Sequence, residues 1–94
     1  MAWLYILRLK SRALYVGATN DLDARYREHQ EGTACRTTTD DPPVELAHSE
    51  EFDTFAASRK RETQVKRWSR AKKEALVRGD LRSLKSLARP EQTR

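Results

Sequence analysis

The sequence is poor in cysteine and in long apolar runs, and each shortage excludes classes of protein. Its single cysteine, Cys35, can form no internal disulfide, and with only two histidines the chain has no His/Cys zinc pattern. A chain without a disulfide framework fits a reducing compartment, so we expect a cytoplasmic protein. Arg8 and Lys10 interrupt the apolar N-terminal run too early for a secretory signal or a membrane span. We therefore expect no membrane partner.

The chain is also short, and acidic residues are fewer than basic ones. Its 94 residues, of which 37% are hydrophobic, suffice for one domain with one modest core. We expect this domain to span residues 1–89, with a frayed tail at 90–94. Nineteen Lys and Arg against fourteen Asp and Glu give a net charge of +5, which favours a polyanionic partner such as nucleic acid.

The charge is unevenly distributed along the chain. Residues 31–53 have a net charge of −6, whereas residues 55–78 have a net charge of +7. An anionic ligand would be steered toward the basic segment and away from the acidic one. Alternatively, the basic segment is a solvated helix face without a partner, and charge alone does not decide between the two.

Two runs of aromatic and branched residues near the N-terminus, at 3–9 and 13–17, predict a β-hairpin. With a three-residue loop between them, Leu7 faces Tyr15 on the opposite strand, and Tyr5 lies on the same side of the sheet. A shift of the register by one residue would separate the tyrosines.

A third strand is predicted at residues 44–52, although this segment has few branched residues. The preceding segment, 32–43, has the composition of a loop, and Pro42 and Pro43 oppose a helix or a central strand there. Together with the helices described next, these strands predict an α+β domain with a small three-stranded antiparallel sheet flanked by helices.

Helical signals begin at Asn20, a good N-cap residue, and predict a first helix that runs to about Gln30. A long helix is predicted over residues 55–78 from its apolar periodicity, with Gly79 as its C-cap. Residues 80–87 have the leucine spacing of a short last helix that packs back on the body.

The first predicted helix violates the amphipathic pattern. Its inward face reads Leu22, Arg25, Tyr26 and His29, so a guanidinium and an imidazole stand where apolar groups are expected. Such violations are expected at functional sites, but a buried and satisfied ion pair would produce the same pattern.

The unusual polar and aromatic residues define a reaction class, although they form no hydrolase triad and no P-loop. Phosphodiester hydrolysis needs a group that deprotonates water, a cation for the charge on the phosphate oxygens, and a divalent ion with an open shell. Tyrosine or histidine, arginine, and glutamate with Mg²⁺ can serve these needs, and the candidates are Tyr5, Tyr15, Arg25, His29 and Glu62.

These residues stand in segments that resemble the GIY-YIG nuclease family. Leu4-Tyr5-Ile6 is similar to the first signature triplet, with leucine in place of its glycine, and Tyr15-Val16-Gly17 is similar to the second. The run from Ala18 to His29 is similar to the family's arginine-bearing helix, and Arg61-Glu62-Thr63 to the segment that supplies its metal-binding glutamate. The resemblance spans about residues 3–80 and is closest to small stand-alone bacterial members.

The resemblance implies a role for each candidate residue. Tyr5 would be the base for the attacking water, Tyr15 would donate or accept a hydrogen bond within the site, and Arg25 would contact the scissile phosphate. His29 would assist proton transfer or orient Tyr5, and Glu62 would be the sole protein ligand to Mg²⁺, or to Mn²⁺. Because one carboxylate makes a weak site, the metal should bind well only with substrate.

The predicted function is a metal-dependent endonuclease that cleaves DNA, including single-stranded or structured DNA, with little sequence specificity. RNA is not excluded, and we expect a monomer or a weak homodimer. The predicted nucleic-acid contacts are basic residues, mostly from the 55–78 segment: Arg27, Arg36, Lys66, Arg67, Arg70 and Lys73. The alternative is a non-catalytic nucleic-acid-binding or adaptor protein, in which the tyrosines are ordinary strand aromatics and Glu62 pairs with Lys66.

Overall fold

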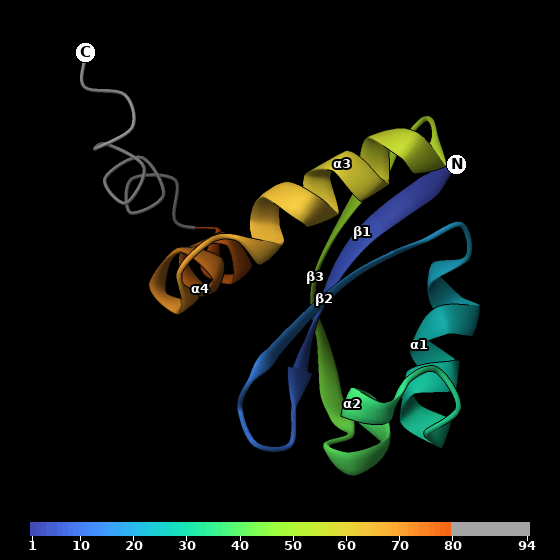
Figure 1. Ribbon diagram of the computed structural model, residues 1–94, viewed down its shortest axis with the longest axis vertical. Coiled ribbons are helices and arrows are strands. Elements are labelled where there is room, and N and C mark those ends of the chain that lie inside the picture. Colours follow the sequence, from blue (N-terminus) through green and yellow to red (C-terminus); the bar gives the residue numbers. More distant parts are fainter. Residues whose placement is uncertain (80–94) are drawn as a thin grey trace.

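The computed structural model describes residues 1–79 of the chain (Figure 1). Its elements follow the order β1 (Ala2–Leu9), β2 (Leu14–Thr19), α1 (Leu22–Glu31), α2 (Arg36–Asp40), β3 (Pro43–Phe52), α3 (Phe55–Lys66) and α4 (Arg70–Arg78). The strands form one antiparallel sheet in the order β2-β1-β3. The predicted α+β class, a three-stranded antiparallel sheet flanked by helices, is therefore confirmed.

The hairpin of β1 and β2 has the predicted register. Leu7 faces Tyr15, and Tyr5 faces Gly17 two pairs further along the strands. The connecting loop closes with a hydrogen bond from the Leu9 N–H to the Ala13 carbonyl. The tyrosines of the two strands consequently lie on one face of the sheet.

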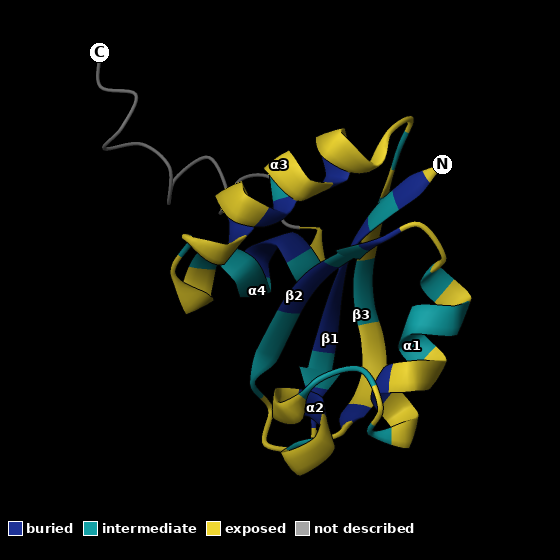
Figure 2. Cartoon of the chain, turned by 45° about the vertical axis from the view of Figure 1, so that its right-hand side comes forward, coloured by how far each residue is buried: buried dark blue, intermediate teal, exposed yellow. Residues whose placement is uncertain are grey.

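The central strand β1 is buried on both faces, which explains why its sequence is almost continuously apolar (Figure 2). On one face, Leu4, Ile6 and Val16 pack against residues of α3 and α4, among them Val65 and Leu76. On the other face, the cluster of Tyr5, Leu7 and Leu9 packs against Leu22 and Tyr26 of α1. The sheet therefore lies between two layers of helix.

The segment predicted as a loop, 32–43, contains the short helix α2, so that prediction was wrong in part. The helix is stabilised by tertiary contact rather than by propensity, since its Thr38 is fully buried against α1. Pro43 is the first residue of β3, which is an edge strand. A proline is tolerated at this position because no backbone N–H is needed there.

The helix predicted over 55–78 is also wrong as a single element, because it breaks between Lys66 and Arg70. The Ser69 hydroxyl accepts a hydrogen bond from the Lys72 N–H and so caps a new helix, α4. The break allows α3 and α4 to pack Val65 and Leu76 into the same cluster.

Helix termini agree with the sequence in part. The N-cap of α1 is Asp21, whose carboxylate accepts from the Ala24 N–H, and not the predicted Asn20. Gly79 ends α4 in the left-handed conformation, as predicted for a C-cap. The predicted helix at 80–87 and the domain boundary at 89 lie outside the described residues. Within residues 1–79, no helix is long and apolar enough to cross a membrane.

An ion-pair network at the outer edge of the sheet yields a prediction about stability in acid. Glu50 of β3 accepts hydrogen bonds from His48 and from the Arg61 guanidinium of α3. These bonds lower the pKa of Glu50 from 4.5 to about 2, the bond from His48 contributing most. A carboxylate whose folded pKa is depressed stabilises the fold above its unfolded pKa, and this contribution is lost as pH falls from 4.5 toward 2.

Glu50→Gln should therefore lower the free energy of unfolding at neutral pH by roughly 1.5–3 kcal/mol, as for other hydrogen bonds to charged groups. The difference from wild type should shrink as the pH is lowered to about 2, which urea unfolding at several pH values would measure. Glu51→Gln, at the next and exposed position of β3, is the control. An unchanging difference across this pH range would contradict the assignment.

Candidate active site

Tyr5 lies at the centre of the candidate site, where β1 passes under α1. Its ring extends over Gly17 of β2, and a Cβ on that residue would lie 2.5 Å from the Tyr5 Cζ. No side chain other than hydrogen fits there while the ring keeps its position. Gly17 therefore lets the Tyr5 hydroxyl reach the edge of the sheet.

His29 links Tyr5 to the short helix α2. Its Nε2 lies 2.9 Å from the Tyr5 hydroxyl, and its Nδ1 lies 2.8 Å from the Thr38 hydroxyl. Both His29 and Thr38 are almost completely buried. The chain Tyr5–His29–Thr38 therefore connects β1, α1 and α2 through one imidazole ring.

The hydrogens in this chain can be assigned by counting donors and acceptors. Burial, with the nearby positive charge of Arg25, lowers the pKa of His29, so the ring is neutral at pH 7 and has one N–H. If Nδ1 holds that hydrogen, it donates to Thr38, whose hydroxyl can donate to the Cys35 carbonyl at 3.4 Å. The Tyr5 hydroxyl then donates to Nε2, and all three hydrogens have acceptors. The other tautomer leaves the Tyr5 hydroxyl without an acceptor among the described residues, so we assign the Nδ1–H form.

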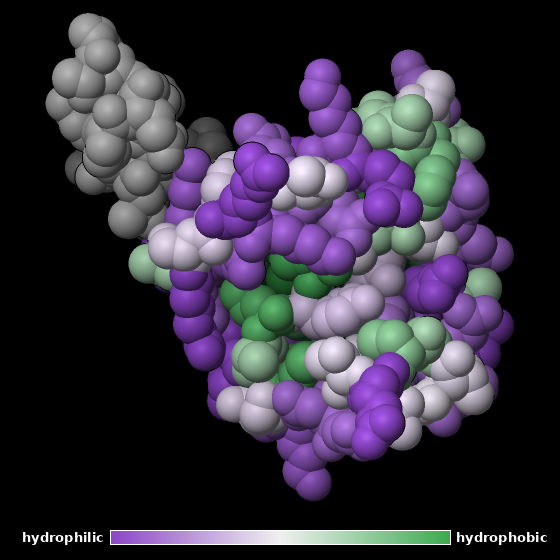
Figure 3. Space-filling view, viewed as in Figure 1, coloured by the Kyte–Doolittle hydropathy of each residue, from purple (hydrophilic) through white to green (hydrophobic). Residues whose placement is uncertain are grey.

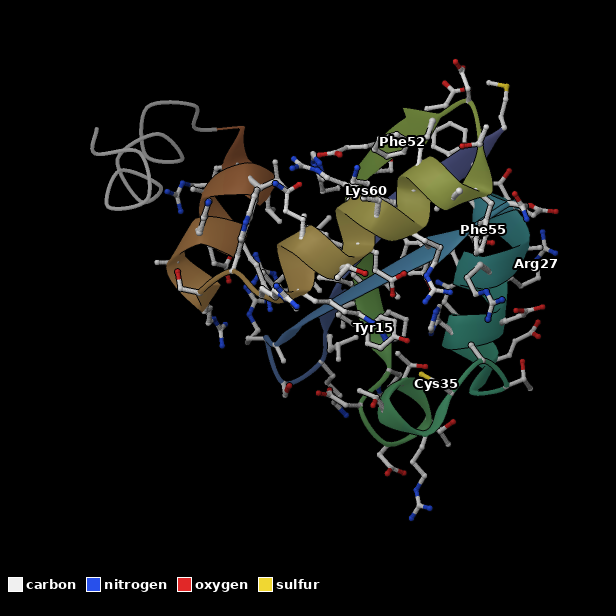
Figure 4. The ribbon with its side chains drawn as sticks, turned by 45° about the horizontal axis from the view of Figure 1, so that its top comes forward. Tyr15, Arg27, Cys35, Phe52, Phe55 and Lys60 are labelled. Atoms are coloured by element: carbon white, nitrogen blue, oxygen red, sulfur yellow. The ribbon has the colours of Figure 1, made fainter. Side chains whose placement is uncertain are left out.

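Tyr15 lies beside this chain, between α3 and the segment that contains Cys35 (Figure 4). Its ring centroid is 5.1 Å from that of His29 and 6.5 Å from that of Tyr5. The Cys35 thiol donates weakly to the Tyr15 oxygen at 3.6 Å. No described residue accepts the Tyr15 hydroxyl hydrogen, which is therefore available to a ligand.

Burial keeps both phenols protonated. It raises the pKa of Tyr15 to about 12, and it raises the pKa of Tyr5 further, with Tyr15 as a second cause. Arg25 lowers the pKa of both tyrosines and Glu62 raises it, so each charge lies close enough to act on both hydroxyls. The structure thus brings Tyr5, Tyr15 and His29 into contact with one another, with Arg25 and Glu62 near enough to influence both hydroxyls.

Arg25 is on α1, one helical turn before His29. Among the described residues it forms an ion pair only with Glu28, at 3.5 Å, and the two side chains are 40% and 49% exposed. The arrangement is therefore not the buried ion pair that the sequence pattern left open. An arginine so exposed can turn toward an anionic ligand at little cost.

Glu62 comes from α3, on the other side of the site from Arg25's helix. Its side chain is only 11% exposed, and its two oxygens pair with Arg59 at 3.0 Å and with Lys66 at 2.7 Å. Residues 1–79 contain no group of three or more His, Cys, Asp or Glu side chains that could hold a metal ion. A metal at Glu62 would thus depend on one protein carboxylate that has first been released from two cations.

The predicted nucleic-acid contacts lie on several elements. Arg67, in the break between α3 and α4, and Lys73 of α4 take part in no ion pair with another described residue. Arg70 donates to the Arg12 carbonyl at 2.7 Å and pairs with Glu74. Arg36 on α2 pairs loosely with Asp40, and Arg27 lies exposed on α1 (Figure 4). Charged residues over α3 border a less polar area at the centre of this face (Figure 3).

Two contributors to the site are absent from the sequence-based candidates. Thr38 lies in the segment predicted as a loop, where three consecutive threonines gave no sign of which one faces inward. Phe55, at the start of α3, borders a hollow next to Arg25. The sequence does show an aromatic residue at the start of the predicted helix, but only the structure shows that it is exposed.

Comparison with known proteins agrees with this geometry. The family model of the GIY-YIG catalytic domain matches residues 1–75. A UPF0213 protein of Natronomonas pharaonis is 41% identical over 75 residues, which cover 80% of this chain and 88% of the relative. A UPF0213 protein of Staphylococcus saprophyticus is 36% identical, with 80% and 92% covered.

A solved structure has the same fold. The solution NMR structure of a UPF0213 protein from Bacillus halodurans matches with a TM-score of 0.55 and 33% identity, covering 85% of this chain and 86% of that one. This solved structure therefore supports the same family assignment as the family model. Together with these small proteins of bacteria and archaea, this chain belongs to the GIY-YIG catalytic-domain family.

Proposed function

We propose that this protein is a cytoplasmic, metal-dependent endonuclease that hydrolyses phosphodiester bonds in DNA with little sequence specificity, as a monomer or a weak homodimer. The observation that carries the proposal is the buried hydrogen-bond chain from Tyr5 through His29 to Thr38, with Arg25 and Glu62 near enough to influence the pKa of Tyr5 and Tyr15. A cation, a carboxylate and a proton-accepting chain in one region meet the needs of phosphodiester hydrolysis.

Tyr5 and His29 would act together as the general base. Because the pKa of Tyr5 is raised, a free tyrosinate is a minor species at neutral pH. The hydroxyl can instead take a proton from the attacking water while its own proton passes to Nε2 of the neutral His29. The carbonyl of Cys35 and the hydroxyl of Thr38 would hold the imidazole in the tautomer that this transfer requires.

Arg25 would contact the scissile phosphate and stabilise the charge that grows on its oxygens. Tyr15, with its hydroxyl hydrogen available, would donate to the same group. Glu62 fits Mg²⁺ or Mn²⁺ as an oxygen ligand, since Mg²⁺ retains waters and is commonly bound by one or two carboxylates with substrate phosphates. Such an ion would supply Lewis-acid stabilisation of the phosphate. Its binding requires Arg59 and Lys66 to leave the carboxylate, and both are long, half-exposed side chains that can turn toward DNA phosphates.

The second candidate function is a nucleic-acid-binding adaptor without turnover, and one observation favours it. Both oxygens of Glu62 are paired with cations of α3, at helical spacings that stabilise the helix by themselves. In that case the carboxylate is structural, and the basic residues of α3 and α4 bind phosphate without cleavage.

Cleavage of labelled single- and double-stranded DNA and RNA, with Mg²⁺ and with chelator, separates the two candidates. Glu62→Gln retains the shape of the side chain and removes its charge, and Arg25→Ala removes a cation that acts on the transition state. Each should lower the cleavage rate by roughly 10²-fold or more, and Glu62→Gln should leave affinity in chelator nearly unchanged. Glu31→Gln, an exposed glutamate on α1, is the control. If both variants cleave at the wild-type rate, any activity comes from other residues or from a contaminant. If the wild-type protein cleaves no substrate, the adaptor function is favoured.

Thr38→Val should lower the cleavage rate by roughly 10²-fold, the lower end of what a positioned acid–base group contributes. The substitution keeps the shape of the side chain but removes the acceptor of the His29 Nδ1–H, so the Nε2–H tautomer becomes available. Nitrogen NMR of the imidazole reports the tautomer directly, and Thr38→Ser should restore both the tautomer and the rate. Thr37→Val, an exposed neighbour on α2, should change neither. A Thr38→Val protein that folds and cleaves normally with its imidazole in the Nε2–H tautomer would refute the proton transfer to His29. One that retains the wild-type tautomer would refute the role of Thr38 in selecting it.

Binding should weaken steeply with salt, because phosphate contacts release counterions from DNA. Arg67→Gln and Lys73→Gln remove charges that belong to no ion pair among the described residues, so their effect is not confounded by a lost internal contact. Each should reduce the slope of log affinity against log salt by about 0.7–0.9 if its side chain neutralises one phosphate. Lys10→Gln, in the hairpin loop, is the control variant, and its slope should equal that of the wild type. Unchanged slopes would move the binding surface away from α3 and α4.

A further inference from the structure

A hollow of about 270 Å³ lies next to Arg25, between the turn that joins β2 to α1 and the start of α3. It is slightly smaller than the roughly 300–1,000 Å³ of typical small-molecule pockets, so it has room for one ring system rather than for a large ligand. Arg25 lines the hollow and also acts on both site tyrosines, so the hollow and the candidate active site share this residue.

We propose that this hollow is a subsite for one unpaired nucleobase of the substrate, stacked on Phe55. The inference rests on the proposed function, because it assumes that Arg25 contacts the scissile phosphate. A nucleotide whose phosphate is held by Arg25 has its base within one sugar of that phosphate, and the hollow begins at the same side chain. Bases within a duplex are stacked and paired, so the subsite accepts a base only from a single strand or a distorted structure.

Phe55 has the features of a stacking surface. It is 37% exposed, although it begins a helix whose other large apolar residue, Val65, is fully buried. Its ring lies at the end of α3 that faces α1 (Figure 4). The Arg59 guanidinium lies 5.9 Å from the ring centroid, where it can meet the phosphate of a stacked nucleotide. Neither buried cluster of the core includes Phe55, so its ring does not serve to fill the core.

The polar lining indicates a base rather than a second phosphate. Asp21 and Glu28 line the hollow, and their negative charges would repel a second phosphate, although Asp21 caps α1 and Glu28 pairs with Arg25. Carboxylate oxygens accept hydrogen bonds, and in a nucleotide the amino groups of the base are among the few groups that can donate them. The Asn20 side chain, which hydrogen-bonds to no described residue, can both donate and accept at the edge of a base.

A second hollow, of about 410 Å³, does not have these features. It is lined by Phe52, Ala57, Lys60, Arg61 and Gln64, toward the other side of α3 (Figure 4). It shares no residue with the candidate active site, and its Arg61 is already bonded to Glu50. A base held there has no connection to Arg25.

The test measures binding in chelator, so that it does not depend on cleavage. Fluorescence anisotropy of a short labelled single-stranded DNA compares wild type, Phe55→Ala and Phe55→Trp, with an abasic site moved along the DNA one position at a time. Phe55→Ala should weaken binding by about 5- to 150-fold, the range of base–aromatic stacking, whereas Phe55→Trp should retain it. Binding to blunt duplex DNA should not change. Val44→Ala, which shortens an exposed apolar side chain on β3, is the matched control.

At one position the abasic site should weaken binding by wild type and have no further effect in Phe55→Ala, because both changes remove the same contact. Wild-type affinity in Phe55→Ala, or additive effects at every position, would overturn the subsite. Such a result would leave the nuclease proposal intact if the wild type cleaves DNA. Conversely, a non-additive position in a protein that cleaves nothing would support the subsite and refute the nuclease.

Discussion

The buried hydrogen-bond chain from Tyr5 through His29 to Thr38 is the interaction on which the rest of the site depends. It joins the central strand to α1 and α2, with both ring nitrogens of His29 bonded at under 3 Å. A buried imidazole with an unpaired nitrogen would be costly, so α2 must keep its position against α1. The same bonds select one tautomer, and that tautomer directs the Tyr5 proton toward His29. One interaction thereby serves stability and the proposed proton transfer.

The electrostatics of the site follow from a neutral interior with charges at its border. Burial keeps Tyr5 and Tyr15 protonated and His29 uncharged. Arg25 and Glu62 lie outside this neutral centre, on helices that cover opposite faces of the sheet. They act on the same two hydroxyls, because the Tyr5 ring extends over Gly17, which has no side chain to block it. A phosphate bound there would meet fixed donors on one side and a carboxylate on the other.

The successes and errors of the sequence-based fold have a common cause. The hairpin register and the Gly79 cap depend on local patterns, namely alternation along two strands and a left-handed terminus, and both are confirmed. The break before α4 and the existence of α2 depend on contacts between distant residues. Val65 and Leu76 join one cluster only if the helix bends, and Thr38 becomes helical against His29 despite its weak helix propensity.

By itself the sequence determined the fold class, the three strands, the first helix and the family, because alternation, capping residues and signature triplets are local features. It also selected the five site candidates. Arg25 and His29 break the pattern of a helix face, whereas Tyr5, Tyr15 and Glu62 stand in segments that resemble the family's signatures. The tertiary structure alone decided which hydrogens the buried chain carries, that Glu62 is paired with two cations, and that Phe55 borders a hollow beside Arg25. These properties depend on distances between side chains from different elements, and no spacing along the chain specifies such distances.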